Sequence, residues 1–193
     1  MNDATTASND LKSLVVISAP SGAGKTTITK RLLKKHPGEL IFSISATTRK
    51  MREGERDGRD YFFLTREKFE ELIEDKGLIE HEEIFGNYYG TPREQIDQAV
   101  HMGKRMLFDI DVKGGLSIKK LYPDDSILIF IAPPDRQTLK KRLEGRGTDS
   151  QEVIERRLDR ADMETKMAEQ YDRIVINDDL ERAVEEVERL IFG

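Results

Sequence analysis

The sequence predicts an α/β protein built on a doubly wound, mostly parallel sheet with a small mixed α/β insert. Short apolar runs that suit buried strands alternate with amphipathic helical segments along most of the chain. The first run, Leu14 to Ala19, leads through a glycine-containing turn into a helix. A later run, residues 106–111, ends in two carboxylates, Asp109 and Asp111. Open α/β sheets bind ligands at such carboxyl ends of strands, so a site is expected there.

The turn after the first strand reads Ser21-Gly22-Ala23-Gly24-Lys25-Thr26 and predicts a phosphate site. A helix N-terminus presents unpaired N–H groups, and two glycines leave the loop free to wrap around phosphate oxygens. Lys25 is expected to reach the terminal phosphates, and the Thr26 hydroxyl to ligate magnesium. Ala19 stands where the motif usually has its first glycine. We expect this alanine to be harmless because the turn needs no positive φ there. The alternative is an ordinary strand-turn-helix with a solvated lysine.

Composition limits the classes of function. The 193 residues suit one domain, and the formal charge of −5 argues against a general nucleic-acid binder. The absence of cysteine excludes disulfides and thiolate metal sites, and three histidines suggest no zinc site. The first apolar run is too short for a signal core or a membrane span. We therefore expect a cytoplasmic protein without membrane or nucleic-acid partners and with a flexible tail at residues 1–13.

The segment after the first helix reads as a small insert in a larger core. The helix should stop at residues 36–38, and residues 40–45 alternate like a strand. An arginine-rich loop at 46–60 precedes a short aromatic strand at 61–64 and a helix capped by Thr65. Two further strands, 78–85 and 88–89, flank a Gly86-Asn87 turn. We assign residues 46–89 to the insert and residues 14–45 and 90–193 to the core.

The remaining segments continue the strand-helix alternation. Thr91-Pro92 predicts a cap and first turn of a helix that ends near Gly103. Strands are expected at 106–111, 126–131 and 174–176, and helices at 136–144, 180–191 and along the stretch beyond residue 150. The apolar face of the long helix would comprise Val153, Leu158, Ala161 and Met167. A glycine-flanked break at 145–150 separates two of these helices.

Charged side chains near these segments are candidates for phosphoryl chemistry. Asp109 is expected near the metal and the loop lysine, since an ionised carboxylate after an apolar run needs a cation. Arg49 and Arg52 could hold a second phosphate, or could belong to a solvated charged loop. Arg142 and Arg146, four residues apart, could form a cationic lid at about 142–160 with Arg157, or could be solubilising surface groups. The aromatic residues Tyr61 and Tyr89 fit either a core or a site.

Seven motifs occur in order between Leu14 and Ile191, and together they resemble the guanylate kinase family. They are Ser21-Gly22-Ala23-Gly24-Lys25-Thr26, Thr47-Thr48-Arg49, Asp60-Tyr61, Gly86-Asn87-Tyr88-Tyr89-Gly90, Asp109-Ile110-Asp111, Leu143-Glu144-Gly145-Arg146-Gly147 and Asn177-Asp178-Asp179. Besides Ala19, the chain departs from the family pattern in having Thr26 and Thr91 where serine is frequent. Both departures keep a hydroxyl.

The resemblance implies a P-loop kinase fold with a GMP-binding insert and a helical lid, and Mg²⁺-dependent transfer of the terminal phosphoryl group of ATP to GMP, and to dGMP. The implied catalytic residues are Lys25, Arg49, Arg142, Arg146, Arg157 and Asp109. ATP would be bound by Ser21, Gly22, Ala23, Gly24, Lys25, Thr26, Thr27 and Asn177, with Thr26 on the metal. GMP would be bound by Ser45, Arg49, Arg52, Tyr61, Glu80, Tyr89, Thr91 and Asp111.

Two alternatives remain beside this reading. One is a non-catalytic module of guanylate-kinase type that binds phosphopeptides, and the other is a kinase of a different phosphorylated acceptor. Lys25, Thr26 and Asp109 argue against the first, since a scaffold has no use for ATP chemistry. Glu80, Ser45 and the run 87–90 favour guanine over other acceptors. The sequence is compatible with a monomer or a homodimer.

Overall fold

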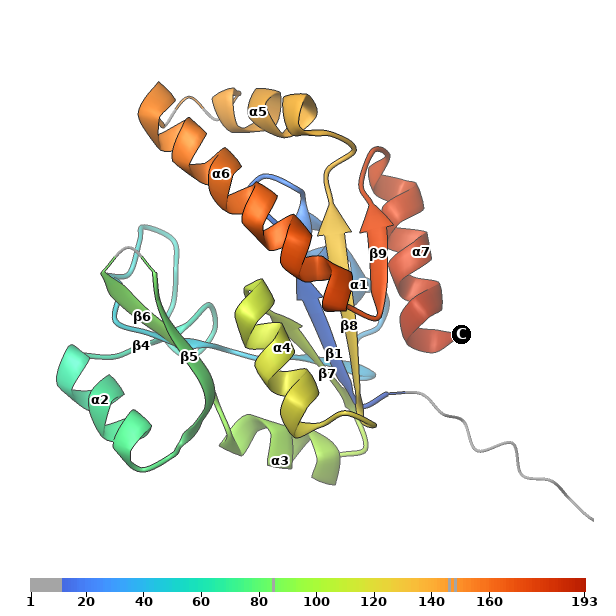
Figure 1. The fold of residues 1–193 in the computed structure, drawn as a ribbon. Coiled ribbons are helices and arrows are strands. Elements are labelled where there is room, and N and C mark those ends of the chain that lie inside the picture. Colours follow the sequence, from blue (N-terminus) through green and yellow to red (C-terminus); the bar gives the residue numbers. More distant parts are fainter. Residues whose placement is uncertain (1–11, 85, 146, 148) are drawn as a thin grey trace, which may run out of the picture.

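The computed structural model describes residues 12–193 apart from 85, 146 and 148, and the backbone alone at 97, 98, 100 and 101. Its larger sheet has five strands in the order β2-β7-β1-β8-β9 (Figure 1). Every pairing in this sheet is parallel, which confirms the predicted doubly wound core. The strands are β1 (Leu14–Ser18), β2 (Leu40–Phe42), β7 (Arg105–Asp109), β8 (Ser126–Ala132) and β9 (Arg173–Ile176).

Helices cover both faces of the larger sheet because its central strands are apolar on both sides. From β1, Val15 and Ile17 join a buried cluster with α1 (Lys25–Lys35) and α7 (Leu180–Phe192). Leu14 and Val16 point the other way and join a cluster with α3 (Glu94–His101) and α4 (Val112–Leu121). The central strand is therefore buried on both faces, as expected for a parallel sheet.

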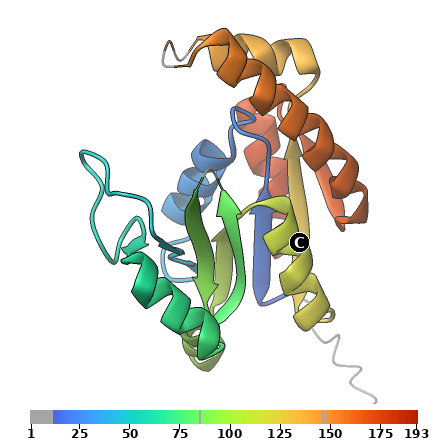
Figure 2. The same cartoon turned by 60° about the vertical axis from the view of Figure 1, so that its left-hand side comes forward.

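The smaller sheet has the strand order β4-β3-β6-β5 and lies within residues 46–92. Because β6 runs past the expected boundary at residue 89, we call residues 46–92 the insert from here on. Its strands are β3 (Ala46–Thr47), β4 (Phe62–Phe63), β5 (Leu78–Ile84) and β6 (Asn87–Pro92). The helix α2 (Arg66–Glu74) packs on this sheet through the fully buried Phe69, and Thr65 caps it as predicted. Figure 2 shows β5 and β6 standing beside α4, so the insert adjoins the core at that helix.

Two helices follow β8; the first lies beyond the carboxyl end of that strand, and the second crosses in front of the larger sheet (Figure 1). They are α5 (Arg136–Glu144) and α6 (Gln151–Met167), and a short 3₁₀ turn, η1 (Ala168–Gln170), follows α6. Leu139 and Leu143 of α5 are buried against Ile154 and Leu158 of α6. The predicted face of α6 is correct for Leu158 and Ala161, whereas Val153 is only partly buried and Ile154 is buried in its place. The lid was expected at about 142–160; because α5 begins at Arg136, we call residues 136–160 the lid from here on.

Three expectations about local structure were wrong. Thr91 and Pro92 do not open a helix but end β6, where Pro92 pairs with Leu78 of β5. Residues 43–45 are not strand, and β3 begins only at Ala46. The helix α4 was not predicted, and Asp111 is its N-cap rather than the end of β7.

In the part of the chain that the structure describes, no helix is both long and apolar enough to cross a membrane.

Candidate functional site

The glycines of the predicted phosphate loop adopt conformations that other residues rarely adopt. Gly22 has φ 96° and Gly24 has φ 99°, and Gly24 is the N-cap residue of α1. Residues 19–22 and 24–27 line an open hollow of about 360 Å³ over the helix N-terminus. Among the described residues, Lys76 is the only residue other than glycine with a positive φ. Ala19 therefore has no positive φ, which confirms the expectation that alanine is tolerated there.

Asn177 holds the phosphate loop in place. Its side-chain Nδ2 donates to the carbonyl oxygen of Ala23 at 2.7 Å, and a Cβ added to Gly24 would collide with this amide. Asn177 also borders a second hollow of about 260 Å³, lined by Thr27, Arg142 and Leu180 among others. Asn177 thus lies beside the expected ATP site, but its side-chain amide is used to fix the loop.

Lys25 and Asp109 form an ion pair at the base of the loop. Both side chains are largely buried, and Lys25 Nζ also lies 3.3 Å from the carbonyl oxygen of Ile110. Thr26 follows on the exposed first turn of α1. The hydroxyl and carboxylate oxygens here are the hard ligands that Mg²⁺ prefers, and magnesium needs only one or two protein oxygens beside phosphates and water. The donor set therefore fits the metal, although the described residues form no group of three His, Asp or Glu side chains around a common point.

A cavity of about 200 Å³ lies between the core and the insert. Lys25, Asp109 and Asp111 of the core line one side of it, and residues of the insert line the other side. The loop lysine and the predicted base-binding carboxylates therefore share one cavity. Its full lining is Ala19, Lys25, Ser45, Tyr61, Glu80, Ile84, Tyr89, Gly90, Asp109, Ile110 and Asp111.

Glu80 of β5 is the most strongly perturbed carboxyl in this cavity. Burial raises the pKa of Glu80 to about 7, with a smaller contribution from Asp111, and the hydrogen bond from Thr91 acts in the opposite direction. Thr91 Oγ1 donates to Glu80 Oε1 at 2.6 Å. The strand position of Thr91, rather than the predicted helix cap, is what brings its hydroxyl to Glu80.

The first turn of α4 completes this side of the cavity. Asp111 Oδ1 accepts a hydrogen bond of 3.0 Å from the backbone N–H of Gly114 and so caps the helix. Gly114 lies so close to the insert that a Cβ there would be 2.9 Å from Glu80 Oε2. Only a residue without a side chain allows Glu80 this close to the helix.

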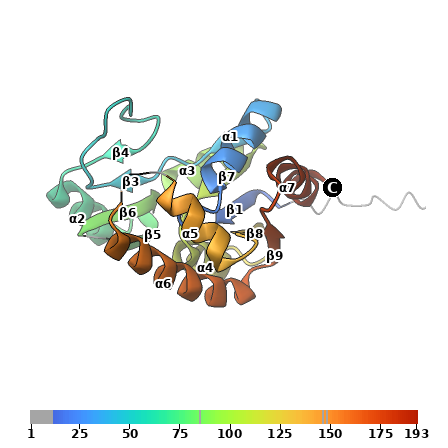
Figure 3. The same cartoon turned by 90° about the horizontal axis from the view of Figure 1, so that it is seen from above.

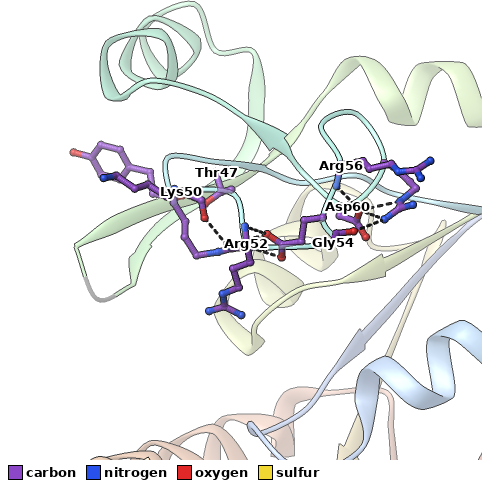
Figure 4. A network of polar contacts seen from close by, with 10 residues as sticks. Thr47, Lys50, Arg52, Gly54, Arg56 and Asp60 are labelled. Carbon is purple, nitrogen blue, oxygen red and sulfur yellow. Dashed lines mark hydrogen bonds and ion pairs between the residues drawn. The ribbon is translucent and has the colours of Figure 1, made fainter. Parts of the chain in front are cut away.

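The predicted phosphate-binding arginines belong to a loop that is folded on itself (Figure 4). Arg49 makes a two-pronged contact with Glu55 at 2.8 and 3.0 Å, and its guanidinium lies over the rings of Tyr61 and Phe63. The hydrogen bond from Arg49 lowers the pKa of Glu55, which also accepts from the backbone N–H of Arg52. The Arg52 residue is exposed. The loop therefore has an ordered arginine beside two aromatic rings and a second, exposed arginine.

The lid arginines point to the phosphate loop. Arg157 Nη1 donates to Ser21 Oγ at 2.8 Å, and Arg142 Nη2 donates to the backbone oxygen of Asn177 at 2.9 Å. The side chains of α5 reach the loop as well, since a Cβ at Gly22 would lie 3.1 Å from Leu139. Arg146, the third expected lid arginine, lies outside the described residues.

The sequence reasoning missed several residues around this cavity. Gly114 was hidden because two adjacent glycines argued against a helix. Glu82 could have been found, because the two-residue period of a strand places it on the same face as Glu80. Lys113 and Arg160, which both contact Glu82, had no signal beyond their charge.

Comparison with known proteins gives a consistent result. The sequence profile of the guanylate kinase family matches residues 11–193. A guanylate kinase from Chlorobaculum tepidum is 49% identical over 174 residues, which cover 90% of this chain and 89% of that protein. A guanylate kinase from Nostoc sp. is 45% identical over 193 residues, or 100% of this chain and 96% of that protein. The crystal structure of guanylate kinase from Anaplasma phagocytophilum is similar with a TM-score of 0.77 and 32% identity, covering 94% of this chain and 85% of that one.

Proposed function

The chain belongs to the guanylate kinase family and is a nucleoside monophosphate kinase, and we propose which of its residues perform each part of the reaction. The proposal is Mg²⁺-dependent phosphoryl transfer from ATP, bound at the phosphate loop, to GMP, bound in the insert. The observation that supports it best is the shared cavity, where Lys25 and Asp109 of the core face Glu80, Tyr61 and Tyr89 of the insert. Donor and acceptor sites that meet in one cavity are what direct transfer requires.

The acceptor base is proposed to bind at Glu80 and Asp111. Guanine has an N1–H and an N2 amine as donors beside its O6 acceptor, whereas adenine has an unprotonated N1. An ionised Glu80 accepts from guanine, and Asp111 lines the same cavity, where it can accept from a second donor. Thr91 orients Glu80 through its 2.6 Å hydrogen bond, and Ser45 lines the same cavity. We assign the GMP phosphate to Arg49, Arg52, Tyr61 and Tyr89.

The ATP phosphates are proposed to bind at the loop formed by Ser21, Gly22, Ala23, Gly24, Lys25, Thr26 and Thr27. Its backbone N–H groups and the dipole of α1 attract phosphate, and Lys25 adds a charge at the terminal phosphate. Thr26 is proposed to hold the Mg²⁺ ion together with phosphate oxygens, and the ion supplies charge neutralisation when bound. Asn177 borders the neighbouring hollow and fixes the loop.

The chemistry requires placement and charge rather than a general base. The second pKa of a phosphate monoester is about 6, so the acceptor oxygen is already ionised at neutral pH. Phosphoryl transfer is accelerated mainly by alignment and by positive charge around the transferred group. Lys25, Arg49, Arg142 and Arg157, together with Arg146, are the proposed sources of that charge. Arg157 links the lid to the loop through Ser21, and a lid closed over the nucleotides would exclude water from the reacting phosphates.

The raised pKa of Glu80 predicts a pH dependence of GMP use. Only the ionised carboxylate accepts from guanine, so kcat/KM for GMP should fall about tenfold per unit as pH decreases below about 7. Steady-state kinetics from pH 5.5 to 9 would measure this, with Glu80→Gln as control. In the pH profile of kcat/KM, the variant should still show the ionisation of the GMP phosphate near pH 6. The decrease near pH 7 that the wild type owes to Glu80 should be absent. A profile that is the same in both proteins would contradict the assignment.

Replacement of Gly114 tests how closely Glu80 must approach α4. Gly→Ala inside a helix usually stabilises by about 0.5–1 kcal/mol, but here the new methyl group would lie 2.9 Å from Glu80 Oε2. We expect Gly114→Ala to raise the KM for GMP about tenfold and to leave the KM for ATP unchanged. Ser117→Ala is the control, because Ser117 lies on the same helix, is only half-buried and donates its hydroxyl to the carbonyl oxygen of Lys113; it should change neither constant. An unaltered KM for GMP in Gly114→Ala would show that Glu80 need not be held there.

A nucleotide panel tests the proposed function directly. ADP formation would be measured with ATP, Mg²⁺ and each of GMP, dGMP, AMP, CMP and UMP, with and without EDTA. We expect activity with GMP and dGMP that disappears with EDTA. Preference for another monophosphate would favour the alternative acceptor, and a folded protein without any activity would favour the phosphopeptide-binding alternative.

A further inference from the structure

Three elements meet at one carboxylate in the insert, Glu82 of β5. Its Oε1 accepts a hydrogen bond of 2.9 Å from Lys113 Nζ of α4. Its Oε2 lies 3.8 Å from Arg160 Nη2 of α6. Figure 3 shows α6 running past β5 and α4, so this contact joins the insert to the helix that carries the lid. The side chain is 19% exposed and that of Arg160 is 30% exposed, so solvent screens the pair only partly.

The contact between Glu82 and Arg160 is incomplete. Glu82 Oε2 is buried and has no hydrogen-bond partner within the described part of the chain. A buried oxygen of this kind costs free energy until a donor reaches it. Arg160 is already oriented, because its Nε donates to Glu164 Oε1 at 2.8 Å. A shift of about 1 Å would bring Nη2 into hydrogen-bond range of Oε2.

The other neighbour of Glu82 is Asp111, the carboxylate assigned to guanine. Burial and the adjacent Asp111 raise the pKa of Glu82, while Lys113 acts in the opposite direction. Two carboxylates side by side repel unless they share a proton or face donors. When guanine donates to Asp111, that carboxylate has its own partner. Glu82 then needs a donor for Oε2, and Arg160 is the nearest ion-pairing group on α6.

We propose that Glu82 and Arg160 are positioning residues that close into a direct hydrogen bond when GMP is bound, and so hold the insert against α6. The inference rests on the proposed GMP site at Glu80 and Asp111. It adds a link between acceptor binding and the helix whose N-terminal half carries Arg157. Lys113 anchors the same carboxylate to the core and keeps Glu82 in place in either state.

A double-mutant cycle tests this link. The proteins are wild type, Glu82→Gln, Arg160→Gln and the double variant. Arg156→Gln is the matched control, because Arg156 lies on the same helix, is exposed, and contacts Glu152 of that helix. We expect Arg160→Gln and Glu82→Gln each to raise the KM for GMP about tenfold, with the double variant no worse than either single one. The KM for ATP and kcat should stay within about twofold of wild type.

Binding and stability measurements separate positioning from a general structural role. Without nucleotide, the melting temperature of Glu82→Gln should stay close to that of Arg156→Gln, whereas Arg160→Gln should melt lower because buried Glu164 loses its partner. In both variants the upward shift of the melting temperature caused by GMP should shrink. Arg160→Lys keeps the positive charge but lacks the several N–H donors of the planar guanidinium, so it should give an intermediate KM for GMP. If Arg160→Gln does not fold, Arg160→Lys and Glu82→Gln provide the same comparison.

Specific results would overturn the proposal. A KM for GMP in Arg160→Gln equal to that in Arg156→Gln, or additive effects in the double variant, would exclude the link. Glu80→Gln is measured alongside to distinguish failure of the link between Glu82 and Arg160 from failure of the proposed GMP site. If Glu80→Gln impairs GMP use but Arg160→Gln does not, only the link fails. If Glu80→Gln leaves GMP use unchanged, the proposed GMP site fails.

Discussion

Replacing Lys25 with methionine should reduce kcat about a thousandfold or more, because a fixed positive charge at the transferred phosphoryl group is lost. Methionine keeps much of the length and volume of lysine and removes only the ammonium group. In the ligand-free protein Lys25 forms an ion pair with Asp109 and contacts the carbonyl oxygen of Ile110. We expect the phosphates of bound ATP to compete with Asp109 for the ammonium group of Lys25. Until ATP binds, the ion pair with Asp109 keeps Lys25 directed to the cavity. Single-turnover kinetics with saturating ATP and GMP would measure the loss.

The control for this variant is Lys34→Met, since Lys34 is exposed on the same helix. It should retain wild-type kcat. Lys25→Met leaves Asp109 without its cation, so unfolding free energy should fall by about 1–2 kcal/mol, and circular dichroism should show an intact fold. Turnover comparable to wild type in a folded Lys25→Met protein would refute the role assigned to this lysine.

The fold was predictable where a periodic pattern decides the local structure. The core strands are apolar runs, and α1, α2, α5 and α7 have clear starts and apolar faces. The helix α4 was missed because Gly114 and Gly115 disfavour a helix by propensity. The structure shows why glycine is needed there: Gly114 lets Glu80 approach, and a Cβ at Gly115 would collide with the hydroxyl of Tyr171. Packing between distant segments therefore decided a helix that local preference argued against.

The same distinction applies to the candidate site. The loop residues 21–26 form a local motif, so their conformation followed from the chain alone, as the φ values of Gly22 and Gly24 show. Thr91-Pro92 was misread because the pair is equally typical of a helix start and of a strand end. The pairing of Pro92 with Leu78 decides between the two, and no local pattern contains it. Contacts such as Glu82 with Arg160 connect segments far apart in sequence, so they could be found only from the folded structure.

The proposed mechanism depends on two opposite charge environments in one cavity. Lys25 brings positive charge to the phosphates, whereas Glu80 and Asp111 form an acidic end suited to the donors of guanine. The acidic end is costly to bury, and this cost appears in the raised pKa of Glu80. In the proposed GMP site guanine would supply the missing donors, so specificity would come from groups that are poorly satisfied without the correct base.

Replacing Glu80 with glutamine should therefore lower kcat/KM for GMP about 100-fold while leaving ATP binding nearly unchanged. Glutamine is isosteric and its oxygen can still accept from Thr91, but its amide group then presents a donor to the donors of guanine. Steady-state kinetics with GMP and AMP and calorimetry with ATP would measure both effects. The matched control is Glu83→Gln, because Glu83 is exposed on the opposite face of the same strand. An unchanged KM and kcat for GMP in Glu80→Gln would count against the assignment.

The same variant makes an independent prediction about stability without nucleotide. The pKa of Glu80 is raised from 4.5 to about 7 in the folded protein, so the folded state holds a proton that the unfolded state has lost. Wild-type stability should therefore fall as pH rises from about 4.5 to about 7 and then level off. Glu80→Gln lacks this group, so its melting temperature relative to wild type should increase across that window and stay higher at pH 8. A difference in melting temperature that does not change with pH would show that the pKa of Glu80 is not raised in the folded protein. Greater stability together with poor GMP use would identify Glu80 as a group kept for binding at the expense of stability.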